Sequence, residues 1–64
     1  MTKALAQDFE LLIKRLNDER NESETQEAKR AYSVAITNAE TSQLWAAKAF
    51  SAEMVADAKV DENY

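Results

Sequence analysis

Apolar residues recur at helical spacing over the first part of the chain. Leu5, Phe9, Leu12, Ile13 and Leu16 lie at i, i+4, i+7, i+8 and i+11. This spacing brings all five to one side of a helix, with charged residues on the other side. The pattern predicts an amphipathic helix over about residues 2–17.

The next segment, NDERNESETQ, contains no large apolar residue. Its composition predicts a solvated turn over about residues 18–23. The side chains of Ser23 with Gln26, or of Asn21 with Glu24, are candidate caps for the helix that follows, because they can bond the free N–H groups of its first turn.

The remaining sequence predicts one long helix over about residues 24–58 and a frayed tail over 59–64. The short polar side chains of Asn38–Ser42 mark the place where this helix could bend or break, since they compete for backbone hydrogen bonds. At 1.5 Å per residue the second helix spans roughly 50 Å and the first about 24 Å, so the first cannot cover the second.

The long helix has two apolar faces. One seam is expected to meet the first helix and holds Tyr32, Ile36, Ala39, Gln43, Ala47, Phe50 and Met54. Nearly opposite lie Val34, Trp45 and Ala52. Two apolar faces on one helix imply two partners, and we expect an oligomer interface formed by Trp45, Leu44, Val34 and Phe50.

The amino-acid composition supports both the helical fold and the oligomer. The 64 residues include no Gly, Pro, Cys or His. Without Gly or Pro the chain lacks the favoured residues of hairpin turns and any strong helix stop, so we expect an all-α fold. So small a chain usually needs a disulfide, a metal or another chain for stability, and only the last is open here. The predicted architecture is a single domain, residues 1–64: an antiparallel two-helix hairpin that assembles into a homo-oligomeric helical bundle.

The same composition limits the chemistry. Without His or Cys we expect no catalytic residue, metal site or cofactor, and therefore no enzyme. A net charge of -4 argues against binding to duplex DNA or to an anionic membrane surface. No apolar run approaches the roughly 20 residues of a membrane span.

A third sector of the long helix carries candidate binding residues. Arg30, Thr37, Thr41 and Lys48 fall on one strip of the helix beside Trp45. Cations, hydroxyls and an indole together suit an anionic ligand with an aromatic part. The other interpretation is a plain solvent face on which Trp45 packs against another copy.

The run from Arg30 to Ala49 resembles the helical-hairpin domain of phage anti-CBASS and anti-Thoeris sponge proteins. The matching positions lie in one register across the run: Arg30, Ser33, Ala35, Thr37, Glu40, Trp45, Ala46, Lys48 and Ala49. The first helix matches through Lys3, Phe9, Leu12, Ile13 and Leu16.

The resemblance implies a homo-oligomer, commonly a hexamer, in the cytoplasm of the infected bacterial host. It implies binding of cyclic di- or trinucleotides or cyclic ADP-ribose isomers, which are held without cleavage. Carried over, Arg30 and Thr37 are expected to contact phosphate and base, and Lys3 a further phosphate. Lys48 is a secondary candidate for a ligand contact. The other function that the sequence leaves open is a small helical adaptor that binds a protein through the Trp45 face.

Overall fold

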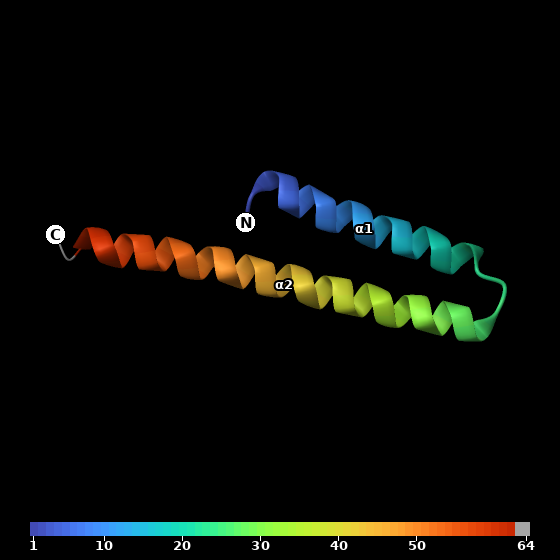
Figure 1. Cartoon of the computed structure of the whole chain (residues 1–64). Helices are drawn as coiled ribbons and strands as arrows, with labels where there is room; N and C mark the ends of the chain where they lie inside the picture. The colour runs from blue at the N-terminus through green and yellow to red at the C-terminus, as the bar shows by residue number, and fades with distance from the viewer. Residues whose placement is uncertain (63–64) are drawn as a thin grey trace.

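The computed structural model describes the backbone of residues 1–62 and the side chains as far as Val55. Two helices, α1 (Lys3–Glu22) and α2 (Gln26–Glu62), pack against each other as an antiparallel hairpin (Figure 1). Residues 1–62 contain no strand. The predicted all-α hairpin is therefore confirmed.

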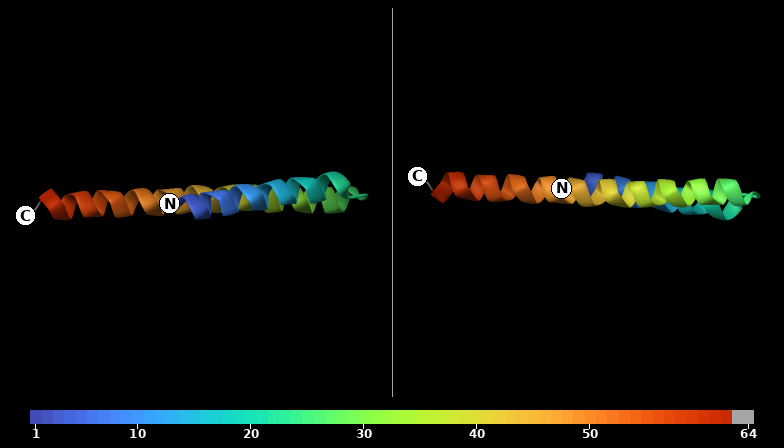
Figure 2. Two further views of the ribbon diagram at one scale, coloured as in Figure 1. Left: turned by 90° about the horizontal axis from the view of Figure 1, so that it is seen from above. Right: turned by 90° about the horizontal axis from the view of Figure 1, so that it is seen from below.

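The hairpin is long and flat. Its principal extents are 60 × 18 × 7 Å, and α2 runs well past the N-terminal end of α1 in every view (Figures 1 and 2). With 37 residues against 20, α2 is longer than α1 by roughly 25 Å. As the sequence predicted, the short helix leaves the end of the long one uncovered.

The start of α1 is fixed by Thr2. Its side-chain oxygen accepts a hydrogen bond from the Leu5 N–H (3.1 Å), and its carbonyl accepts one from the Ala6 N–H (3.0 Å). Free N–H groups of the first turn are thereby satisfied.

The end of α1 lies five residues later than expected, because Asp18–Glu22 continue the helix. Glu and Arg are good helix formers, and the Ser23 N–H and hydroxyl donate to the carbonyls of Arg20 (3.2 Å) and Glu19 (2.9 Å) at its end. The turn is thus confined to residues 23–25. Ser23 leaves the helix in an extended conformation, so the described backbone needs no residue at positive φ.

Neither predicted capping pair starts α2. Its N-cap is Thr25, whose hydroxyl oxygen accepts from the Ala28 N–H (3.1 Å). Asn21 lies inside α1, and the Ser23 hydroxyl is already used at the end of that helix. The first residue of α2 is therefore Gln26 and not residue 24.

The long helix is continuous through Asn38–Ser42 and ends at Glu62. Ala39, in the middle of this segment, is buried against α1, and packing there outweighs the weak helix propensity of its polar neighbours. Residues 59–62, expected to be frayed, belong to the helix, while residues 63–64 of the predicted tail lie outside the described residues.

The core is very small. Among the residues whose side chains are described, only Ile36 and Ala39 are buried, each with 8% of its surface exposed. Half-buried residues continue the seam on both helices: Ala6, Phe9, Ile13 and Leu16 of α1, and Tyr32, Gln43, Ala46 and Ala47 of α2. One layer of side chains between two helices is all that holds the hairpin together.

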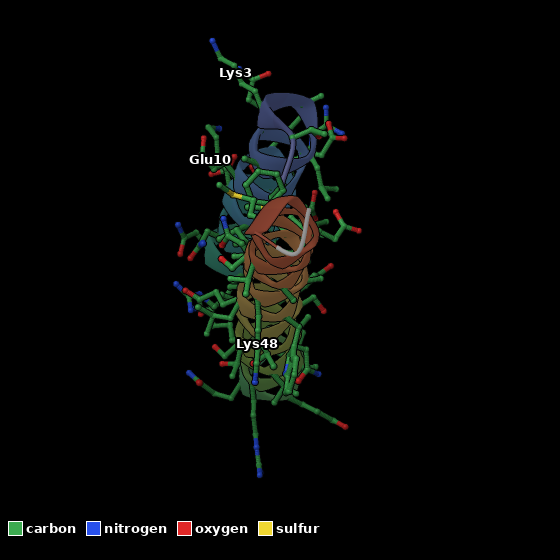
Figure 3. The ribbon with its side chains drawn as sticks, turned by 90° about the vertical axis from the view of Figure 1, so that its left-hand side faces the viewer. Lys3, Glu10 and Lys48 are labelled. Atoms are coloured by element: carbon green, nitrogen blue, oxygen red, sulfur yellow. The ribbon has the colours of Figure 1, made fainter. Side chains whose placement is uncertain are left out.

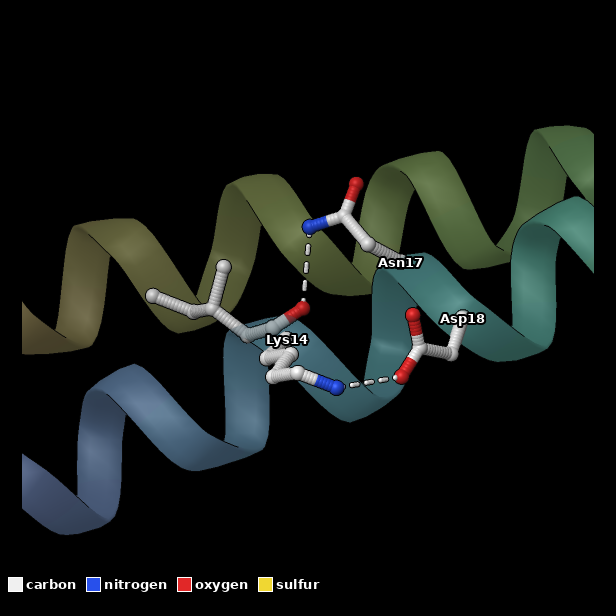
Figure 4. Close-up of polar contacts among 4 residues, drawn as sticks. Lys14, Asn17 and Asp18 are labelled. Atoms are coloured by element: carbon white, nitrogen blue, oxygen red, sulfur yellow. Dashed lines mark hydrogen bonds and ion pairs between the residues drawn. The ribbon is translucent and has the colours of Figure 1, made fainter.

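One side-chain contact ties the two helices near the turn. The Arg20 guanidinium donates to the Ser33 hydroxyl (3.4 Å) and to the Asn17 side-chain oxygen (2.8 Å). The Asn17 amide in turn donates to the Ile13 carbonyl at 2.9 Å (Figure 4). This chain of bonds orients Arg20 toward α2.

Candidate functional site

The outer face of α2, the side turned away from α1, brings together four of the five predicted ligand residues. Arg30, Thr37, Thr41 and Lys48 are all exposed there, separated by seven, four and seven residues. From Arg30 to Lys48 the helix rises roughly 27 Å, so the four side chains form a strip and not a closed pocket.

Trp45 and Lys48 contact each other on this face. The Lys48 ammonium lies 4.7 Å from the centre of the Trp45 ring, within the range of a cation–π interaction. The indole remains 63% exposed. One ring face is thus partly taken by Lys48, and the rest is open for stacking or for packing against another chain.

The two threonine hydroxyls have a defined role in the free chain. Thr37 donates to the Ser33 carbonyl (3.1 Å) and Thr41 to the Thr37 carbonyl (2.9 Å). Their protons are used within the helix, so each hydroxyl offers only its acceptor side outward. Donating to a phosphate oxygen requires the hydroxyl to turn away from its carbonyl.

Lys3, the fifth predicted ligand residue, lies elsewhere. It belongs to the first turn of α1 and is exposed on the opposite side of the hairpin from Lys48 (Figure 3). Within one chain Lys3 does not share a site with Arg30, which lies near the other end of the hairpin. The five residues can meet only if different copies of the chain contribute them.

The predicted interface residues divide between two faces. Leu44 and Val34 are 72% and 54% exposed and flank the strip. Phe50 lies on the side of α2 that faces the start of α1. The outer face of α2 comprises Arg30, Val34, Thr37, Thr41, Leu44, Trp45 and Lys48.

A shallow hollow lies where α1 begins. It has a volume of about 280 Å³, is open to solvent, and is lined by Met1, Thr2, Leu5, Ala46, Ala49, Phe50 and Glu53. Partial removal of water lowers the pKa of the Met1 amine, and the nearby Glu53 carboxylate opposes this shift. The small side chains of Ala46 and Ala49 leave this space, which is mostly apolar and has one carboxylate at its edge.

Sequence reasoning missed three exposed or polar features of α1. Leu11 was not part of the predicted apolar stripe. Leu5 and Leu12 were part of it, yet both remain about half exposed. The contact between Arg20 and Ser33 joins residues 13 positions apart and leaves no local signal. By contrast, Lys14 and Asp18 form an exposed i, i+4 ion pair of 2.9 Å (Figure 4). The spacing of the two residues in the sequence is sufficient to predict such a pair.

The described part of the chain contains no sign of a metal site or of a membrane span. No group of three or more acidic side chains there is placed to hold a metal ion. Neither helix, within that same part, is both long and apolar enough to cross a membrane.

Comparisons of the chain with protein-family models, with curated proteins and with solved structures found no match. The resemblance described above therefore depends on the residues of the sequence itself.

Proposed function

We propose that the protein sequesters cyclic oligonucleotides or cyclic ADP-ribose-type second messengers of bacterial anti-phage defence, in the cytoplasm of the infected host, without cleaving them. One observation carries the proposal: Arg30, Thr37, Thr41 and Lys48 share one exposed helix face with Trp45. Guanidinium and ammonium groups bind phosphates, and an indole stacks on bases.

The proposed binding unit is a homo-oligomer, with a hexamer favoured. A flat strip on one chain cannot enclose a ligand, whereas two strips from different copies can form the walls of a pocket. The hairpin also exposes two separate apolar surfaces, one around Leu44 and Trp45 of α2 and one around Leu11 and Leu12 of α1. A closed assembly larger than a dimer needs more than one contact surface on each chain, and these two surfaces can provide them.

Calorimetry with a panel of cyclic di- and trinucleotides and cyclic ADP-ribose isomers tests the proposal. Arg30→Ala is expected to weaken binding by about tenfold or more, because it removes a charge-assisted hydrogen bond to phosphate. Arg15→Ala is the matched control, since Arg15 is an exposed arginine of α1 and its loss changes the net charge equally. The control should bind like the native chain.

Two companion measurements separate binding from assembly and from catalysis. Light scattering should give the same mass for Arg30→Ala as for the native protein; a smaller species means that Arg30 holds the oligomer together instead. Mass spectrometry of the ligand recovered after denaturation should return it intact. A cleaved ligand contradicts simple sequestration.

The exposure of Leu44 and Trp45 also favours a second function, that of a small helical adaptor which binds a protein partner through this face. The calorimetric panel decides between them. A folded oligomer that gives no heat with any of these ligands leaves the adaptor as the better explanation.

A further inference from the structure

The outer face of α2 has an internal symmetry. Along it lie six residues in a row: Arg30, Val34, Thr37, Thr41, Leu44 and Lys48. Their separations are four, three, four, three and four residues, so the row reads the same in both directions about position 39. Ala39 itself is buried against α1, on the other side of the helix.

A row of this kind is self-complementary. Separations that alternate between three and four residues are those of helices that pack side by side in a coiled coil. Because the row is unchanged when the helix is reversed, it fits an antiparallel copy of itself around a two-fold axis, which is the requirement of an isologous dimer contact.

We propose that a second copy of this chain packs antiparallel on the outer face of α2, with the two-fold axis opposite Ala39. Thr37 then lies beside the partner's Thr41, and Val34 beside the partner's Leu44. Arg30 lies beside the partner's Lys48. Each contact occurs twice.

The exposed area of the hairpin supports this occupant. The chain exposes 5342 Å². A compact folded monomer of its 7.2 kDa mass exposes only about 4,100 Å². The excess, about 1,200 Å², is of the same order as the roughly 800 Å² that each partner contributes to a stable interface. A second copy on the outer face of α2 covers the most exposed apolar side chains described, Leu44 and Trp45.

The two ends of this interface are cationic. Arg30 and the partner's Lys48 repel each other when they meet without a counterion, and a phosphate between them turns the repulsion into two charge-assisted contacts. Lys48 already lies against Trp45 within its own chain, so the partner's Trp45 lies at the same end of the interface as the partner's Lys48. Glu27, one turn before Arg30, reduces the positive charge but does not cancel it.

Each dimer thus holds two equivalent phosphate sites, roughly 27 Å apart. The register of the helices depends on the row alone, whereas the identity of the anion as the phosphodiester of a nucleotide rests on the proposed function.

Cysteine cross-linking tests the register, because the native chain has no Cys. Thr37→Cys and Thr41→Cys chains, mixed and mildly oxidised, should give several-fold more disulfide-linked heterodimer than either gives of homodimer alone. Asn21→Cys, an exposed position of α1 away from Leu11 and Leu12, is the control and should give little cross-linking with either. Homodimers in excess, or no cross-linked species at all, overturn the antiparallel register.

A charge reversal tests the phosphate sites. At constant ionic strength, replacing chloride by inorganic pyrophosphate should tighten the native dimer by about tenfold in sedimentation equilibrium. Lys48→Glu should dimerise tightly in chloride and lose the response, because a carboxylate then faces Arg30. The control Lys14→Glu, on α1, should keep it. A Lys48→Glu chain that dimerises more weakly in chloride than the native protein overturns the pairing.

The two proposals can fail separately. Pyrophosphate-dependent dimers with the predicted cross-links, but no heat with any cyclic nucleotide, contradict only the proposed ligand. Calorimetric binding of a cyclic nucleotide without the cross-links contradicts only the antiparallel pairing.

Discussion

Threonine hydroxyls act differently at the ends and in the middle of the helices. Thr25 accepts a hydrogen bond from an N–H that has no other partner in the first turn of α2. Thr37 and Thr41 donate to carbonyls that already accept a helical hydrogen bond. The first kind of contact stabilises the helix, and the second contributes little to it.

Thr25→Ala should therefore lower the free energy of unfolding by about 1 kcal/mol, the usual effect of losing an N-cap. Asn21→Ala is the informative control, because sequence reasoning made Asn21 a candidate cap while the structure places it inside α1. Its replacement by the better helix former should be neutral or slightly stabilising. Urea unfolding followed by circular dichroism, at one fixed chain concentration, measures both; equal losses contradict the assignment of the cap.

The type of residue that starts α2 could be predicted from the sequence, but not its position. Capping residues are abundant between Asn17 and Gln26, and several pass the local criteria equally well. The choice depends on where α1 ends, and this is influenced by the contact of Arg20 with Ser33 on the other helix. Local pattern contains no information about that contact.

At the level of the helices, the seam of α2 departs from its predicted course. Tyr32, Ile36 and Ala39 lie in it as expected. A strict period of 3.6 leads from there to Met54, which the structure leaves 57% exposed. Glu53 lines the hollow at the start of α1, and beyond this point α1 no longer covers α2. The periodicity of one helix alone does not reveal where the helix packed against it begins.

Comparing Ile36→Ala with Met54→Ala tests whether the seam follows its predicted or its observed path along α2. Ile36 is one of the two buried side chains described, so its truncation should cost about 2 kcal/mol, at the lower end for a core with so few neighbours. Met54→Ala should change the free energy of unfolding by less than about 0.5 kcal/mol. Urea unfolding of the two variants gives the comparison, and a larger loss at Met54 than at Ile36 contradicts the observed seam.

At the level of the whole molecule, a hairpin with only two buried residues among its described side chains cannot draw much stability from its own core. In the proposed assembly, contacts between copies add to the free energy of folding, and this contribution depends on chain concentration. The length of the chain and the absence of Cys and His predict such an assembly. The sequence predicted that Arg30, Thr37, Thr41 and Lys48 share one strip of the long helix. It could not reveal that Lys3 lies on the other side of the hairpin, because that separation depends on how α1 packs against α2.

Trp45 reports on assembly directly, since it is the only tryptophan in the chain and is 63% exposed in a single hairpin. As the chain concentration rises, its fluorescence should shift to shorter wavelength and the midpoint of thermal unfolding should increase, because assembly buries the indole and stabilises the folded chain. Leu44→Ser should move both transitions to higher concentration, whereas Leu11→Ser, on α1, should leave the fluorescence transition of Trp45 in place. If thermal stability rises with concentration while the Trp45 emission stays constant, the copies meet through α1, and the outer face of α2 remains free for a ligand or another protein.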